Sequence, residues 1–214
     1  MGCAMIIAVD GPTASGKGTI ARALARHFGI PHLDTGLLYR AVGLQTARNG
    51  GDADKESDAL AACDFPDSLL DDPDLRLEST GSLASRVSVH PAVRAALLER
   101  QRAFANQPGG AVLDGRDIGT VIAPHADAKL FIVASPEARA LRRQAELAGR
   151  GVATDLASVT RDIYLRDERD AGRAAAPLVK AADADLLDTS DLTIGNAVQW
   201  AIALVEARTN RRSD

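Results

Sequence analysis

The chain has 214 residues, the length of one domain, and its 46% hydrophobic and 25% charged residues are typical of a globular protein rather than a disordered or fibrous one. Its net charge of −4 at pH 7 and its 3% aromatic residues argue against general nucleic-acid binding, which needs basic surfaces and stacking platforms. We therefore expect no nucleic-acid partner.

The basic residues are unevenly divided between the two types, because 21 of the 25 are arginines. A guanidinium binds phosphate through two parallel hydrogen bonds, whereas an ammonium acts as a point charge. The arginines are therefore compatible with a phosphate site in an acidic chain. The alternative is a coding bias that places arginine on the surface as a generic cation.

The two cysteines, Cys3 and Cys63, are far apart and have no histidine cluster beside them, so neither a zinc site nor a disulfide framework is predicted. The apolar run at 5–9 is interrupted by Asp10, far short of a signal peptide or a membrane span. These features predict a cytoplasmic protein with no membrane partner.

Short apolar runs alternate with helical patterns along the chain, which predicts an α/β protein with a parallel sheet covered on both faces. Strands are expected at 5–9, 31–33, 111–113, 129–134 and 186–187. Helices are expected at 17–28, 36–48, 52–62, 91–104, from Ser135-Pro136 onward, from Asp155 to about Arg173, and at 194–208. Residues 64–82 are rich in Pro and Asp and predict an insertion with at most a short strand at 75–77.

The stretch between the first strand and the first helix fits the phosphate-loop pattern of Gly, four residues, and Gly-Lys. In such a loop the backbone N–H groups and the helix N-terminus surround a phosphate, and the lysine neutralises charge on the transferred group. The residues expected to bind ATP here are Gly11, Pro12, Thr13, Ala14, Ser15, Gly16, Lys17, Gly18 and Thr19. The alternative is a glycine-rich turn that only caps the helix.

Gly18 stands where the general pattern has the Ser or Thr that binds magnesium, and Thr19 follows one place later. Direct binding of magnesium by a loop hydroxyl is therefore in doubt, and an ion held largely through water fits its reluctance to lose water. The protein ligands of the metal stay open.

Four further segments, together with the Gly-Lys-Gly-Thr ending of the loop, resemble the bacterial cytidylate kinases. They are LDTGLLYR at 33–40, ASRV at 84–87, LDGRDIGT at 113–120 and RDERDAGRAAAPLV at 166–179. The resemblance runs from residue 6 to about 192. It implies one P-loop kinase domain over 1–214 with a five-stranded parallel sheet, an acceptor-binding insertion at about 52–90 and a lid at about 142–172. It also implies a cytoplasmic monomer of pyrimidine metabolism that uses ATP and Mg²⁺ to convert CMP and dCMP into CDP and dCDP.

The same resemblance implies roles for residues on the acceptor side. Lys17, Arg116 and Arg173 would be catalytic, and Arg40, Arg116 and Arg173 would hold the acceptor phosphate. The residues implied to bind CMP are Thr35, Tyr39, Arg40, Ser85, Arg94, Asp114, Arg116, Asp117, Arg166, Asp170 and Arg173.

Two of these implied roles also have support from physical reasoning. Residues 166, 170 and 173 are spaced to share one helix face, which agrees with the implied place of Arg166 and Asp170 near the sugar hydroxyls. The alternative is a surface ion pair between Arg166 and Asp170. Asp117 would accept a hydrogen bond from the cytosine amino group and repel the uracil carbonyl. The alternative for Asp117 is a helix N-cap.

Arg142 and Arg143 belong to an arginine-rich segment before Gly151, which is the expected lid. We expect both to bind ATP phosphates, with a solvated helix end as the alternative.

Two other functions are alternatives to a cytidylate kinase: a kinase for another small acceptor, such as UMP or shikimate, and a nucleotide-binding switch protein. The absence of an Asn-Lys-x-Asp guanine motif from the sequence counts against the switch protein.

Overall fold

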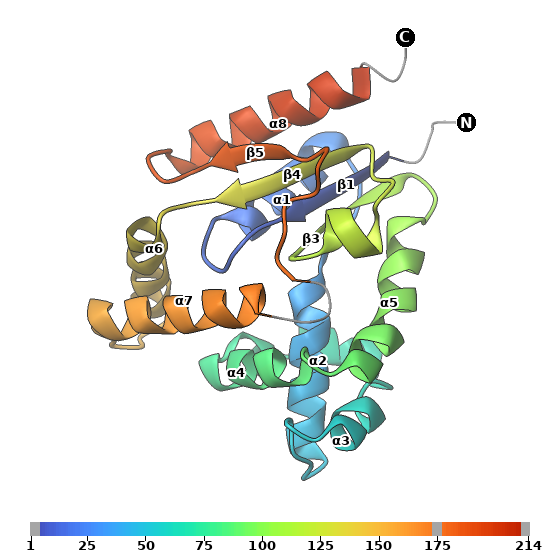
Figure 1. The fold of residues 1–214 in the computed structure, drawn as a ribbon, viewed down its shortest axis with the longest axis vertical. Helices are drawn as coiled ribbons and strands as arrows, with labels where there is room; N and C mark the ends of the chain where they lie inside the picture. The colour runs from blue at the N-terminus through green and yellow to red at the C-terminus, as the bar shows by residue number, and fades with distance from the viewer. Residues whose placement is uncertain (1–4, 173–176, 211–214) are drawn as a thin grey trace. The chain divides into compact units, whose positions relative to one another are not determined.

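The computed structural model describes residues 5–172 and 177–210, and its contacts divide the chain into two compact units. The first unit comprises Met1–Leu33 and Ala105–Asp214, and the second comprises Asp34–Phe104. Figure 1 shows the elements of both units, which are described separately below.

A five-stranded sheet forms the centre of the first unit. Its strands, in the order β2-β3-β1-β4-β5, are β1 (Met5–Asp10), β2 (His32–Asp34), β3 (Gly110–Gly115), β4 (Ala128–Val133) and β5 (Asp185–Asp188). β1 pairs in parallel with both β3 and β4, and β4 pairs in parallel with β5. The five predicted strands and the predicted parallel sheet are thereby confirmed.

The helices α1 (Lys17–Phe28) and α8 (Ile194–Asn210) pack against this sheet. Ile7 and Val9 alternate along β1, point to the same face, and join Leu24 of α1 and Val205 of α8 in one buried cluster. Ala8, on the opposite face of β1, is fully buried too. β1 is therefore covered on both faces, which explains why its sequence is continuously apolar.

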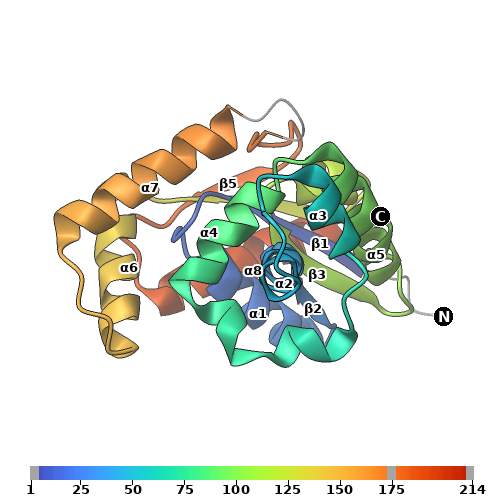
Figure 2. The same cartoon turned by 90° about the horizontal axis from the view of Figure 1, so that it is seen from below.

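A helical hairpin follows β4. It consists of α6 (Pro136–Gly149) and α7 (Leu156–Ala171), which lie side by side in Figures 1 and 2 around a small core that includes Leu147 and Ile163. Side-chain caps start both helices: Ser135 accepts a hydrogen bond from Ala138 N at 3.2 Å, and Asp155 accepts one from Ser158 N at 2.9 Å. Both predicted starts are confirmed.

The second unit is helical. It contains α2 (Thr35–Arg48), α3 (Glu56–Ala61), two short 3₁₀ turns, η1 (Asp67–Asp71) and η2 (Pro73–Arg76), then α4 (Glu78–Val87) and α5 (Pro91–Ala105). α2 and α4 pack closely at Gly43, where an added Cβ would lie 2.8 Å from Leu83 Cβ. The helix expected at 52–62 begins only at Glu56.

The short strand expected at 75–77 is wrong, because most of that segment forms η2. Asp72 caps the turn by accepting a hydrogen bond from Asp74 N at 2.9 Å, and Pro73 occupies its first position, where the fixed φ of proline favours a helical turn. Leu69 and Leu75 are buried singly, without the alternation of a strand.

Within the described residues, every helix is too short or too polar to cross a membrane.

Candidate active site

The loop between β1 and α1 is built on backbone conformations that its glycines permit. Gly11 has φ 155°, and an added Cβ would lie 2.1 Å from the carbonyl oxygen of Ile132 in β4. Gly16, the N-cap of α1, has φ 91°, in the left-handed region that glycine tolerates. Each position therefore depends on glycine for its own reason: close approach at Gly11 and a left-handed turn at Gly16.

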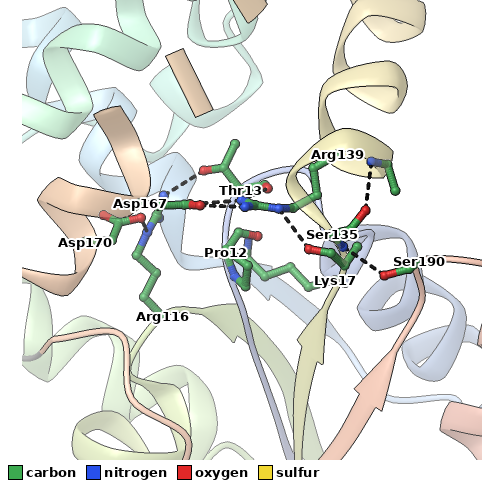
Figure 3. A network of polar contacts seen from close by, with 11 residues as sticks. Pro12, Thr13, Lys17, Arg116, Ser135, Arg139, Asp167, Asp170 and Ser190 are labelled. Atoms are coloured by element: carbon green, nitrogen blue, oxygen red, sulfur yellow. Dashed lines mark hydrogen bonds and ion pairs between the residues drawn. The ribbon is translucent and has the colours of Figure 1, made fainter. Parts of the chain in front are cut away.

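Lys17 folds back over this loop, with its Nζ donating to Pro12 O at 3.3 Å (Figure 3). The hydroxyl of Ser15 is buried in the loop and has no hydrogen-bond partner among the described residues. A buried polar atom without a partner is costly, so this hydroxyl suits a polar ligand in the loop.

A pocket of about 640 Å³ opens beside the loop. The pocket is lined by residues 14–19 of the loop and by Arg142 and Arg143 of α6, together with Leu192 and Ile194. The volume lies in the range of small-molecule sites. The structure therefore brings Arg142 and Arg143 to the same pocket as the loop.

Arg142 and Arg143 both have protein partners. Arg142 donates to Thr189 Oγ1 at 3.0 Å and also to the Thr189 carbonyl, and Arg143 pairs with Glu146 at 2.8 Å. Thr189 in turn donates to Ser15 O at 2.9 Å, so Arg142 is connected to the loop through one buried threonine.

On its other side the loop contacts two arginines through Thr13 (Figure 3). The hydroxyl of Thr13 accepts a hydrogen bond from Arg116 at 3.0 Å, and its carbonyl accepts one from Arg139 at 3.3 Å. Arg116 also pairs with Asp170 in the last turn of α7. Arg116 and Asp170, both expected on the acceptor side, are thus in direct contact.

α7 brings the predicted acceptor residues together only in part. The helix ends at Ala171, so Arg166 and Asp170 share it, whereas Arg173 lies outside the described residues. The Asp170 carboxylate is 2% exposed and binds Arg116, so it is a buried group rather than part of the surface.

Asp117 directly precedes a single π-helical turn, η3 (Ile118–Ile122). Its carbonyl accepts the N–H of Val121 at 2.9 Å, but its side chain makes no capping hydrogen bond to the turn. The alternative role of Asp117 as a side-chain N-cap is therefore wrong.

Asp10 is a residue of this site that the motif analysis missed. Its two carboxylate oxygens accept the backbone N–H groups of Ile118 and Gly119, each at 2.8 Å. Burial raises the pKa of Asp10 to about 7, although these two N–H groups act to lower it. Asp10 thus fastens the turn that follows Asp117, and a carboxylate at the end of a buried apolar strand was the available signal.

Asp114 is the penultimate residue of β3 and lies beside the start of α1. Its Oδ1 lies 2.6 Å from His32 Nε2, and its Oδ2 lies 3.5 Å from the position of an added Cβ on Gly18. His32 was also missed, since one histidine in a short strand is not distinctive in sequence.

In the second unit, α2 and α4 carry the remaining predicted acceptor residues: Thr35, Tyr39 and Arg40 on α2, and Ser85 on α4, with Arg94 on α5. Arg40 donates to the carbonyls of Leu75 and Leu77 at 2.7 and 3.1 Å and passes over Gly81 of α4. The Arg94 guanidinium lies 5.8 Å from the centre of the Tyr39 ring. Arg94 and Tyr39 are therefore neighbours within this unit.

Comparison with known proteins agrees with this arrangement. A model of the cytidylate kinase family matches residues 7–207. The chain belongs to the cytidylate kinase family.

The chain is similar to known cytidylate kinases over almost their full length. It is 58% identical to the cytidylate kinase of Xanthobacter autotrophicus, over 95% of this chain and 98% of that protein. It is 54% identical to the cytidylate kinase of Methylocella silvestris, over 95% of this chain and 94% of that protein. A gluconokinase structure from Sinorhizobium meliloti 1021 shares the fold, with a TM-score of 0.54 and 16% identity over 98% of this chain and 95% of that one.

Proposed function

We propose that the chain transfers the γ-phosphoryl group of ATP to CMP and dCMP, giving CDP and dCDP. Beside the family assignment, one contact carries the proposal: the hydrogen bond from Arg116 to Thr13 Oγ1. It joins the arginine expected on the acceptor phosphate to the loop expected on ATP. Phosphoryl transfer depends on bringing two charged phosphates together, so donor and acceptor groups must lie side by side.

On the donor side, we assign ATP to the pocket beside residues 11–19. The backbone N–H groups and the N-terminus of α1 bind the phosphates, and Lys17 neutralises the charge that shifts toward the leaving group. Arg142 and Arg143, which line the pocket, add positive charge. This set positions the γ-phosphoryl group and stabilises its transition state without any covalent intermediate.

On the acceptor side, the family assignment leads us to assign the CMP phosphate to Arg40, Arg116 and Arg173. Asp170 holds the Arg116 guanidinium in place and, with Arg166, binds the sugar hydroxyls. A guanidinium that is already oriented loses less rotational freedom when the phosphate arrives. Thr35, Tyr39 and Asp114 complete the acceptor set.

Base selection is assigned to Asp117, with Ser85 and Arg94. A carboxylate accepts from the cytosine amino group and repels the carbonyl that uracil has at the same position. Asp10 supports this role because it fastens the turn next to Asp117.

Magnesium fits the donor side of the site. Ser15 offers a buried hydroxyl that has no hydrogen-bond partner in the part of the chain that the structure describes, and Asp114 offers a carboxylate beside Gly18. Among the described residues no three His, Cys, Asp or Glu side chains gather to hold a metal. One carboxylate with water and phosphate oxygens is the usual magnesium environment in kinases, so we assign Asp114 as the carboxylate ligand, with the Ser15 hydroxyl bound to the ion through water. When bound, the ion neutralises the phosphate charge that develops during transfer.

We further propose that the chain acts as a cytoplasmic monomer and as one kinase domain over 1–214, with an acceptor-binding insertion at about 52–90 and a lid at about 142–172. The α6–α7 hairpin with its own small core supports the lid as a structural element.

A coupled assay of ADP formation with a panel of acceptors tests the proposed function. CMP and dCMP should support turnover, whereas UMP and shikimate should support much less. ATP turnover that needs no acceptor would instead favour a switch protein, and a preference for UMP or shikimate would contradict the substrate assignment. A Lys17→Met variant serves as the control, because ADP formation that persists in this variant does not come from this site.

A further inference from the structure

Arg139 connects three elements of the first unit. The residue lies in the first turn of α6, and its side chain is 4% exposed. Its Nε donates to Ala134 O at 3.1 Å, at the end of β4. One terminal nitrogen donates to the carbonyl of Thr13 in the phosphate loop at 3.3 Å. Both terminal nitrogens donate to the two carboxylate oxygens of Asp167 on α7, at 2.9 and 2.5 Å.

These contacts require the planar fork of arginine. A lysine keeps the charge but cannot donate in parallel to both oxygens of Asp167 while also reaching two carbonyls. A bidentate pair of this kind, in which the arginine is buried and the carboxylate partly buried, fixes direction as well as distance. Arg139 therefore holds β4, the loop and α7 in one relative position.

The same loop residue is tied to α7 a second time. Asp167 and Asp170 are three residues apart on α7 and so lie on neighbouring positions of one helix surface. Asp167 reaches the Thr13 carbonyl through Arg139, and Asp170 reaches the Thr13 hydroxyl through Arg116 (Figure 3). Displacing Arg139 would therefore move α7 relative to the loop and disturb the Arg116–Asp170 pair.

We propose that Arg139 is a positioning residue for phosphoryl transfer, which sets the place of α7 and of Arg116 relative to the phosphate loop without touching either substrate. This inference rests on the proposed function. A displacement of about 1 Å at reacting groups costs on the order of a hundredfold in rate, so a loosened α7 should lower kcat. Lys17 and the loop N–H groups stay in place, so ATP binding should change little.

The test compares Arg139→Lys with Arg208→Lys. Arg208 also forms a bidentate pair, with Asp185, at 2.7 and 2.6 Å, and neither of these hydrogen bonds involves the loop. Both substitutions keep the positive charge and remove the two parallel hydrogen bonds of the guanidinium. Steady-state kcat and KM for CMP and ATP are measured well below each variant's unfolding midpoint, and binding of a non-hydrolysable ATP analogue is measured by calorimetry.

Arg139→Lys should lower kcat by about tenfold or more, while the affinity for the ATP analogue stays within about threefold. Arg208→Lys should change kcat by less than about twofold. Unchanged kcat in Arg139→Lys, or an equal loss in both variants that follows their thermal stability, would overturn the proposal. If Arg139→Lys does not fold, Asp167→Asn decides: a kcat loss supports the role, and wild-type kcat contradicts it.

A double variant adds a second criterion. If Arg139 acts through Asp167, then Arg139→Lys with Asp167→Asn should cost no more in kcat than the worse single variant, whereas additive losses would contradict the coupling. The wild-type chain is assayed first with and without CMP. If its ADP formation does not depend on CMP, the proposed function itself fails; if it does depend on CMP and Arg139→Lys is unaffected, only the positioning role fails.

Discussion

Arg116, just after β3, binds the buried carboxylate of Asp170 in the last turn of α7. The two residues are proposed to contact different parts of CMP: Arg116 binds the phosphate, and Asp170 binds the sugar hydroxyls. Because the two side chains orient each other, the acceptor site is partly organised before the substrate binds. Losing either partner should therefore affect binding and chemistry together.

Arg116→Met should lower kcat/KM for CMP by about a hundredfold or more, since it removes a charge-assisted fork from the transferring phosphates. Asp170→Asn should cost less, because the guanidinium remains. Steady-state kinetics with varied CMP measure both effects. Wild-type kcat/KM in Arg116→Met would contradict the assignment of this arginine to the acceptor phosphate.

Lys17→Met should lower kcat by on the order of a hundredfold to a thousandfold, the usual cost of removing one transition-state charge contact. Lys55→Met is a matched control, since Lys55 is 66% exposed and pairs with Asp58 outside the phosphate loop. Thermal unfolding of both variants separates a catalytic effect from loss of fold. An equal effect of the two substitutions on kcat would count against the phosphate loop as the ATP site.

Asp117→Ala should reduce the preference for CMP over UMP by about tenfold to a hundredfold, which corresponds to the loss of one base-reading contact. The change in preference should come mainly from a lower kcat/KM for CMP. An exposed carboxylate, Asp64, provides the control substitution Asp64→Asn. The ratio of kcat/KM values for the two acceptors is the measurement, and an unaltered ratio in Asp117→Ala would exclude the carboxylate as the selecting group.

Asp10 should make the stability of the fold depend on pH. Burial raises its folded-state pKa to about 7 from an ordinary value of 3.8, so the folded protein binds more protons than the unfolded chain between these values. The free energy of unfolding should therefore fall as pH rises from about 4 to about 7, by at most about 1.4 kcal/mol per pH unit from this group.

Urea unfolding of the wild type and of Asp10→Asn at pH 5 and pH 7.5 tests this dependence. The free energy of unfolding of the wild type relative to that of the variant should be greater at pH 5. Asparagine does not titrate, and the effects of all other carboxyl groups cancel because both proteins contain them. Equal differences at the two pH values would show that Asp10 does not titrate in this range.

The sequence predicted those parts of the fold that local signals define. The boundaries of α1 agree with the prediction, because its loop ends in Gly16-Lys17 and Gly29 forms its C-cap. Ser135 and Asp155 mark the starts of α6 and α7 through their caps. The segment around Pro73 was misjudged because isolated buried leucines, rather than a periodic pattern, stabilise its 3₁₀ turns.

The candidate site was predictable as a set of residue types but not as a set of contacts. Motifs marked Arg116 and Asp170 separately, yet their pairing joins positions 54 residues apart. Asp10 binds a turn more than a hundred residues away, so no local pattern pointed to it. Long-range pairs of this kind depend on which strands are neighbours in the sheet.

Product analysis by phosphorus NMR tests the central claim, transfer rather than hydrolysis, most directly. With ATP, Mg²⁺ and CMP, the account predicts that each ADP formed is accompanied by one CDP, whose terminal phosphate comes from the γ-position of ATP. Inorganic phosphate appearing in step with ADP, without CDP, would contradict it.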